Sequence, residues 1–145
     1  MAGAWGGSCS DQDANNFIIA SGADPITAAA ICTLVTSAKN NGWWSLCSAI
    51  YPFIGGTSNS CKYNLKDPRD LNEAFRLIFV GGMTFSLTGI TGDGLSGYAD
   101  TNLNASTVLS ITDIHFSIYV ETDIVEHRRD MGVSAGSNVS NIAIF

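Results

Sequence analysis

Charged residues, and basic residues above all, are scarce in this 145-residue sequence. Charged side chains make up 14% of the chain, with 7 Lys and Arg against 13 Asp and Glu, so the formal net charge is -6. The basic residues are scattered, which leaves no electrostatic footprint for a phosphate backbone. We therefore expect no nucleic-acid binding. The surface must be rich in Ser, Thr, Asn and Gly, and it suits permanent burial against neighbours as well as solvent.

Long apolar runs and a signal sequence are also lacking. No run approaches the ~20 apolar residues of a membrane span. Residues 1–7 (MAGAWGG) do not have the basic-then-apolar order of a signal peptide. We expect no membrane span, and synthesis in a cytoplasm.

The sequence contains no recognised catalytic or metal-binding motif, such as GxSxG, HExxH, a phosphate-binding glycine loop or a dinucleotide fingerprint. Its 4 cysteines are Cys9, Cys32, Cys47 and Cys61. They are too widely spaced for a CxxC zinc or redox motif, and a cytoplasmic compartment predicts reduced, partly buried thiols. Asp93 lies in a Gly-Asp-Gly turn that only weakly suggests calcium, and His127 is interpreted as part of a solvated turn or a subunit contact. We therefore expect no catalytic residue, metal or cofactor, and no enzymatic activity.

Residues 1–48 have helical periodicity and are predicted to form an N-terminal helical lead. Ala14, Phe17 and Ile18 recur at helical spacing between the possible N-caps Ser10 and Asp11 and the stop signal Gly22. A second helix is predicted over residues 25–40, with Asp24 as N-cap and Pro at the first helical position. A third short helix is expected over residues 43–49.

Residues 49–145 are predicted to form a β-sandwich part, because short β-prone runs alternate with Gly-rich turns. The clearest strand is 113–121, where Ile114, Phe116, Ile118 and Val120 point one way and the intervening side chains point the other. This pattern favours a sandwich or jelly roll. The other strands are expected at 49–54, 61–65, 75–80, 84–87, 97–101 and 139–145.

Three stretches, residues 49–57, 62–70 and 75–77, resemble a module of virion proteins, including tail fibres, of tailed bacteriophages. Residues 49–57 (AIYPFIGGT) are similar to the family's AIYPFVGG strand, and residues 64–70 (NLKDPRD) match its turn. Residues 97–101 (GYADT) and 115–119 (HFSIY) resemble neighbouring strands of a concanavalin A-like, or laminin G-like, jelly roll. The resemblance covers residues 13–122 and implies a mainly β jelly roll behind a helical lead.

Members of this family usually continue beyond the position of Phe145. The resemblance therefore implies either a sandwich that is incomplete in this chain and is completed by a neighbouring subunit, or a reduced variant of the domain. An exposed edge at residues 139–145 would be the place where the second chain pairs.

Six residues are candidates for glycan or interface contacts. Arg69 and Arg76 could clamp a carboxylate or carbohydrate, although the charges of residues 64–70 more simply stabilise a turn around Pro68. The strand face that carries His115 and Tyr119 could bind sugars together with Trp43 and Trp44. The two tryptophans could instead pack between the helix and the sheet and anchor the helix there.

The leading functional hypothesis is a structural component of a phage virion, in a tail, fibre or surface appendage. Its partners would be other copies of itself and other virion proteins, and it would reside in the virion after assembly in the host cytoplasm. One alternative is a lectin-like module that recognises host surface glycans. Another is a capsid decoration protein, while a glycan-cleaving enzyme would need a carboxylate pair that the sequence does not suggest.

Overall fold

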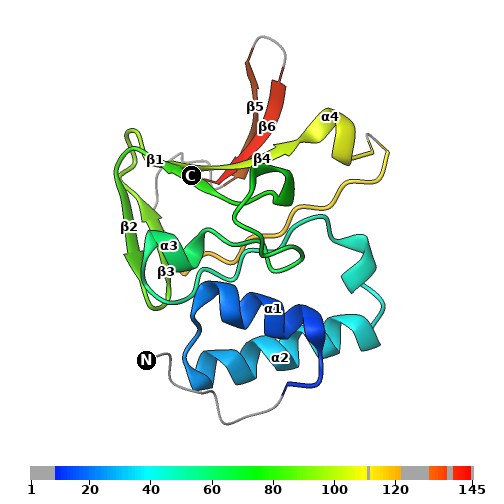
Figure 1. Ribbon diagram of the computed structural model, residues 1–145. Helices are drawn as coiled ribbons and strands as arrows, with labels where there is room; N and C mark the ends of the chain where they lie inside the picture. The colour runs from blue at the N-terminus through cyan, green and yellow to red at the C-terminus, as the bar shows by residue number, and fades with distance from the viewer. Residues whose placement is uncertain (1–8, 111, 122–130, 137–138, 145) are drawn as a thin grey trace. The chain divides into compact units, whose positions relative to one another are not determined.

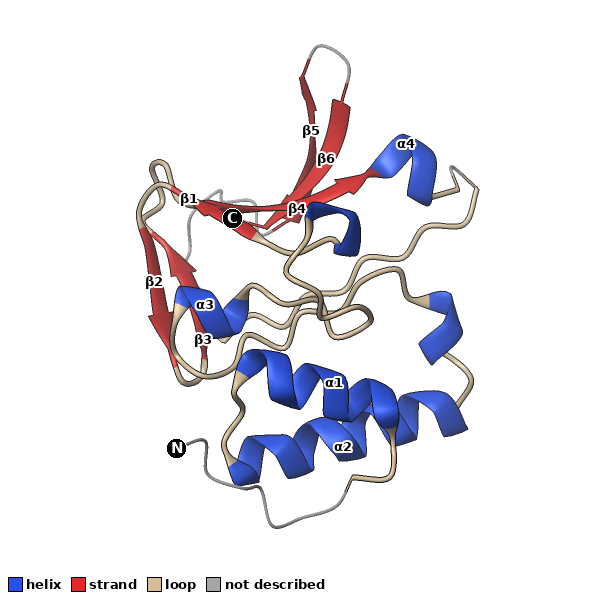
Figure 2. Cartoon of the chain, in the orientation of Figure 1, coloured by secondary structure: helices blue, strands red, loops and turns tan. Residues whose placement is uncertain are grey.

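The computed structural model describes residues 9–110, 112–121, 131–136 and 139–144 and shows a mixed α/β protein (Figures 1 and 2). The chain divides into two compact units. Unit 1 comprises Met1–Leu77 and Phe85–Ile90, and unit 2 comprises Ile78–Thr84 and Thr91–Phe145. No helix within the described residues is both long and apolar enough to cross a membrane.

Two helices begin unit 1, and both confirm their predictions. The helix α1 (Gln12–Ser21) starts where the Asp11 carboxylate accepts hydrogen bonds from two backbone N–H groups, and it ends at Gly22, whose φ of 68° is left-handed. The helix α2 (Pro25–Asn40) starts in the same way at Asp24. Each cap satisfies amide groups that have no partner inside the helix.

The apolar stripes of the two helices form one side of the core of unit 1. Phe17 of α1 is 1% exposed and Val35 of α2 is fully buried. Tyr63 and Leu65, from the segment after the helices, belong to the same cluster. Helix spacing therefore places the apolar residues correctly, and a segment of irregular backbone covers them.

The segment after α2 forms short helices joined by irregular backbone, and the first of them lies where a third short helix was expected, over residues 43–49. Its elements are the 3₁₀ helices η1 (Trp44–Leu46) and η2 (Asn72–Ala74) and the helical turn α3 (Ser58–Cys61). The predicted strands at 49–54 and 61–65 are wrong. Thr57 and Ser60 form a capping box that starts α3, and Phe53 has a φ of 51°, which strands do not adopt.

The side chain of Asn64 organises this irregular segment. It is 1% exposed, and its Oδ1 accepts hydrogen bonds from the backbone N–H groups of Ile50 and Lys66, each at 3.0 Å. Its Nδ2 donates to the carbonyl of Ala74 at 3.0 Å. The Asn64 amide thus provides hydrogen bonds for backbone groups of three separate stretches. In a sheet, backbone groups of neighbouring strands would provide them.

Unit 2 is built on a four-stranded antiparallel sheet in the order β1-β4-β6-β5. Residues of β4 alternate in burial, with Ala99, Thr101 and Leu103 inside. The β4–β6 register shifts between Asp100 and Asn104. The strands are β1 (Ile78–Val80), β4 (Tyr98–Asn104), β5 (Met131–Gly136) and β6 (Val139–Ile144).

A bulge in β4 explains the shift in register. Asn102 has a left-handed φ of 55°. The Thr101 hydroxyl donates to the Ile142 carbonyl at 2.8 Å and accepts from the Leu103 N–H at 3.1 Å. The side chain thereby replaces ladder hydrogen bonds that the bulge interrupts.

The turn before β4 is held by one carboxylate. Oδ1 of Asp93 accepts hydrogen bonds from the backbone N–H groups of Leu95, Ser96 and Gly97 at 2.8–2.9 Å. These donors, that of Ser96 first, hold the pKa of the Asp93 carboxyl far below its usual range. Asp93 is therefore a structural residue of this turn.

A second sheet pairs β2 (Met83–Ser86) with β3 (Gly89–Gly92). Residues 85–90 of this pair belong to unit 1, and its remaining residues belong to unit 2. The strand β2 confirms the expectation at 84–87 approximately. Neither β3 nor β5 was expected.

The expected mainly β jelly roll, incomplete and completed by a neighbour, is wrong. The chain forms two small sheets with a substantial helical part instead of two facing layers of strands. The C-terminal strand β6 is real but is not an edge, because β4 pairs with it on one side and β5 on the other. The strand expected at 113–121 does not form, and that at 75–80 is reduced to β1.

Replacing Asn64 with Ala should destabilise the protein by about 3 kcal/mol, since two partly buried N–H groups and one buried carbonyl lose their partner. Urea unfolding measures this change. Asn59→Ala, at an exposed residue of α3, is the matched control and should leave the midpoint unchanged. Equal midpoints for both variants would show that Asn64 does not have this role.

The carboxyl of Asp93 should titrate well below 3.8, its usual value. Because its pKa is lowered in the folded protein, the ionised Asp93 carboxylate stabilises the fold. This contribution is fully present above pH 3.8 and is lost as the pH falls through the lower pKa of the folded state. NMR of the carboxyl carbon measures the midpoint. Ser96→Ala should raise it only slightly, because the backbone donors remain; a midpoint near that of an unfolded peptide would contradict the assignment.

Candidate functional site

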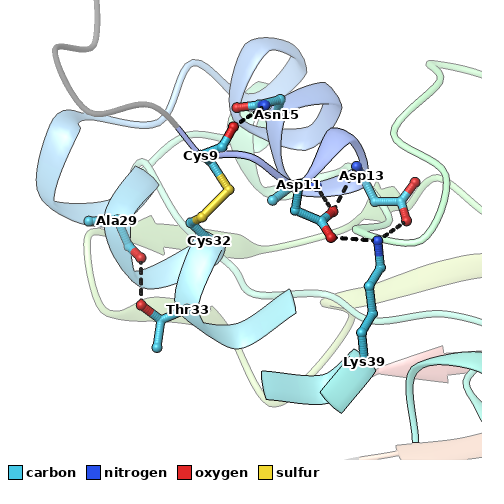
Figure 3. The surroundings of a disulfide bond; sticks show 9 residues. Cys9, Asp11, Asp13, Asn15, Ala29, Cys32, Thr33 and Lys39 are labelled. Atoms are coloured by element: carbon cyan, nitrogen blue, oxygen red, sulfur yellow. Dashed lines mark hydrogen bonds and ion pairs between the residues drawn. A yellow bond between two sulfur atoms is a disulfide. The ribbon is translucent and has the colours of Figure 1, made fainter. Parts of the chain in front are cut away.

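A disulfide bond joins the segment before α1 to the middle of α2 (Figure 3). Cys9 and Cys32 lie 23 residues apart in sequence, and their Cα atoms are 5.8 Å apart. The side chain of Asn15 donates to the Cys9 carbonyl at 2.7 Å and fixes this end of the bridge. The expectation of reduced thiols is therefore wrong for these two cysteines, because helix packing brings together residues that sequence spacing does not pair. Cys47 and Cys61 are free.

An ion-pair cluster lies at the C-terminal end of α2. The ammonium of Lys39 is 2.7 Å from carboxylate oxygens of both Asp11 and Asp13 (Figure 3). The hydrogen bond from Lys39 lowers the pKa of Asp11, and the two carboxylates raise the pKa of Lys39. These groups are partly exposed, so the pairs orient α2 against the start of α1 more than they stabilise the fold.

Two lysine side chains lie over the ring of Trp44. The ammonium of Lys66 is 4.1 Å from the ring centroid and that of Lys39 is 5.5 Å from it. Lys66 also donates to the Trp44 carbonyl at 2.6 Å, and burial lowers its pKa. Because the ring also packs against the core of unit 1, Trp44 serves as an anchor. Its neighbour Trp43 is 36% exposed.

The two candidate arginines are paired with carboxylates of their own turn. Arg69 donates from Nε to Asp67 at 2.8 Å. Arg76 donates from Nη1 to Asp70 at 2.7 Å and from Nε to Asn72 at 3.1 Å. These contacts are those expected of a charged turn and leave each guanidinium neutralised locally. The geometry supports the structural interpretation of both residues over a ligand clamp.

His115 and Tyr119 lie in unit 2, in residues 112–121, all of which are exposed. The side chain of Tyr119 is 91% exposed. The two tryptophans belong to unit 1. His127 lies outside the described residues.

The remaining expectations concern metals. Among the residues that the structure describes, no group of three His, Cys, Asp or Glu side chains could hold a metal ion. The oxygens of Asp93 already accept hydrogen bonds from its own turn.

Residues 113–121 present an apolar face, whose alternation is typical of a strand with one face in a core. Its side chains are 40–49% exposed, although they alternate with polar ones as in a half-buried strand. They are Ile114, Phe116, Ile118 and Val120. A row of exposed apolar side chains is typical of an interaction surface.

No protein-family model, curated protein or solved structure matches this chain. The resemblance to phage virion modules therefore stays a prediction from the sequence.

Reducing the disulfide should lower the free energy of unfolding by about 3 kcal/mol, as expected for a loop of this length. Urea unfolding with and without dithiothreitol measures the effect. The Cys9→Ser, Cys32→Ser double variant should no longer respond to the reductant, whereas Cys47→Ser should respond as the unmodified protein does. An unmodified protein that is insensitive to reduction would contradict the assignment.

Proposed function

We propose that this chain is a structural component of a tailed-phage virion and acts through subunit assembly. The observation that carries the proposal is the exposed apolar face of residues 113–121. Covering these four side chains is favourable, since full burial of an exposed apolar side chain contributes roughly 1.5–3 kcal/mol and somewhat less than half of the surface of each is still exposed. A neighbouring subunit of an assembly would cover them.

Two further features support a structural role. The surface is poor in charge, so burying it against a neighbour desolvates few ions. The disulfide suits a protein that spends its working life in an oxidising environment, which includes the surface of a virion.

Glycan binding is less favoured by the geometry. Ring faces that stack on sugars must be accessible, and lysines lie over the ring of Trp44. Arg69 and Arg76 are engaged by Asp67 and Asp70. Tyr119 is far more exposed than Trp43, and it shares its segment with the apolar face.

Mass spectrometry of purified particles of the phage that encodes this chain tests the proposal. The chain should be present in many copies and should withstand a high-salt wash. A replication enzyme of the same phage is the control for carry-over from the lysate. Absence from washed particles would refute the proposal, and antibody labelling would distinguish the tail from the capsid.

A further inference from the structure

Residues 114–120 have the side-chain pattern of a strand but form none with the described parts of this chain. Figure 1 shows the segment as a drawn-out loop, coloured orange. Ile114, Phe116, Ile118 and Val120 are 45%, 46%, 40% and 49% exposed, and the intervening residues are exposed too. Both faces are therefore accessible in the single chain.

The backbone of this segment is equally accessible. Asp113 closes a turn through a hydrogen bond from its N–H to the Ser110 carbonyl at 3.3 Å. From residue 114 to residue 120, no backbone group has a hydrogen-bond partner among the residues that the structure describes. Such a backbone offers the unpaired N–H and C=O groups that a second strand requires.

We propose that residues 114–120 pair antiparallel with the same segment of a second copy, around a two-fold axis at Ser117. The sequence Ile-His-Phe-Ser-Ile-Tyr-Val has the same apolar and polar order in both directions. A two-fold axis at its centre therefore sets apolar residues opposite apolar ones and polar residues opposite polar ones. This inference rests on the proposed function and names the partner: another copy of the chain.

The two-fold register is distinguished from its alternatives by what it pairs. It sets Ile114 opposite Val120 and Phe116 opposite Ile118, on one face of the ribbon. A shift by one residue would set apolar side chains opposite polar ones, and a shift by two would leave an apolar residue outside the pairing. A parallel arrangement in register would also set apolar residues opposite apolar ones, but it would place His115 opposite its own copy, whereas the two-fold register places it opposite Tyr119 of the partner subunit.

The polar face is compatible with the same register. His115 lies opposite Tyr119 of the partner subunit and diagonal to Glu121 of the partner subunit, within reach of an imidazole and a carboxylate. Asp113 would lie opposite Glu121 of the partner subunit, where like charges repel. The ladder therefore ends at residues 114 and 120, a length of about seven residues that is ordinary for a strand.

A two-stranded ribbon is only marginally stable by itself, and a net charge of -6 on each chain opposes its formation in solution. Pairing should therefore be favoured where copies are held close together, as in a particle. Salt should strengthen it by screening the repulsion between chains.

Disulfide trapping tests the register directly, in a Cys47→Ser background; Cys61 is buried and stays in place. Ser117→Cys places a thiol on the two-fold axis, opposite its own copy, so mild oxidation of the concentrated protein should give covalent dimers. His115→Cys is the matched control, because its thiol faces Tyr119 of the partner subunit, and it should give several-fold fewer. A mixture of His115→Cys and Tyr119→Cys proteins should form the mixed dimer.

Phe116→Asp in the Ser117→Cys protein should suppress the dimer, since it puts charge into the apolar face. Equal trapping of Ser117→Cys and His115→Cys, or no trapping of either, would overturn the inference. The outcome is separable from that of the proposed function: a chain present in washed particles whose Ser117→Cys variant does not form dimers is a virion protein that assembles through another surface.

Discussion

The buried amide of Asn64 holds together the part of unit 1 that has almost no regular secondary structure. Its hydrogen bonds reach Ile50, Lys66 and Ala74, which lie in three different stretches of chain. Because buried backbone groups must be satisfied, these stretches can cover the helical core only while the amide is in place. Leu65, next to it, is fully buried against that core. One polar side chain thus determines where an apolar neighbour is placed.

The helical half of unit 1 is held by a different set of contacts. The disulfide fixes Cys9 to α2, and Lys39 joins the far end of α2 to the start of α1. The ring of Trp44 contacts Lys39 and also Lys66, and so links α2 to the segment that follows it. These contacts engage Lys39, Lys66 and Trp44 with one another and with the start of α1.

Unit 2 shows the converse situation, in which a strong local pattern is left without a partner. Its sheet is complete within the described residues, with β6 paired on both sides. Residues 113–121, with the clearest alternation in the chain, remain outside it and exposed. The alternation of apolar and polar residues shows that an extended segment has one apolar face. It does not show which chain covers that face. A second copy of the same segment is the partner that its own symmetry fits.

The sequence by itself determined the two helices to within a residue, because caps, periodicity and stop signals are local. It also located β2, β4 and β6 approximately. Only the tertiary structure decided that residues 49–54 and 61–65 are not strands, that Cys9 pairs with Cys32 and that the arginines serve their own turn. These outcomes depend on contacts between residues far apart in the chain, and a pattern of neighbouring residues carries no record of such contacts.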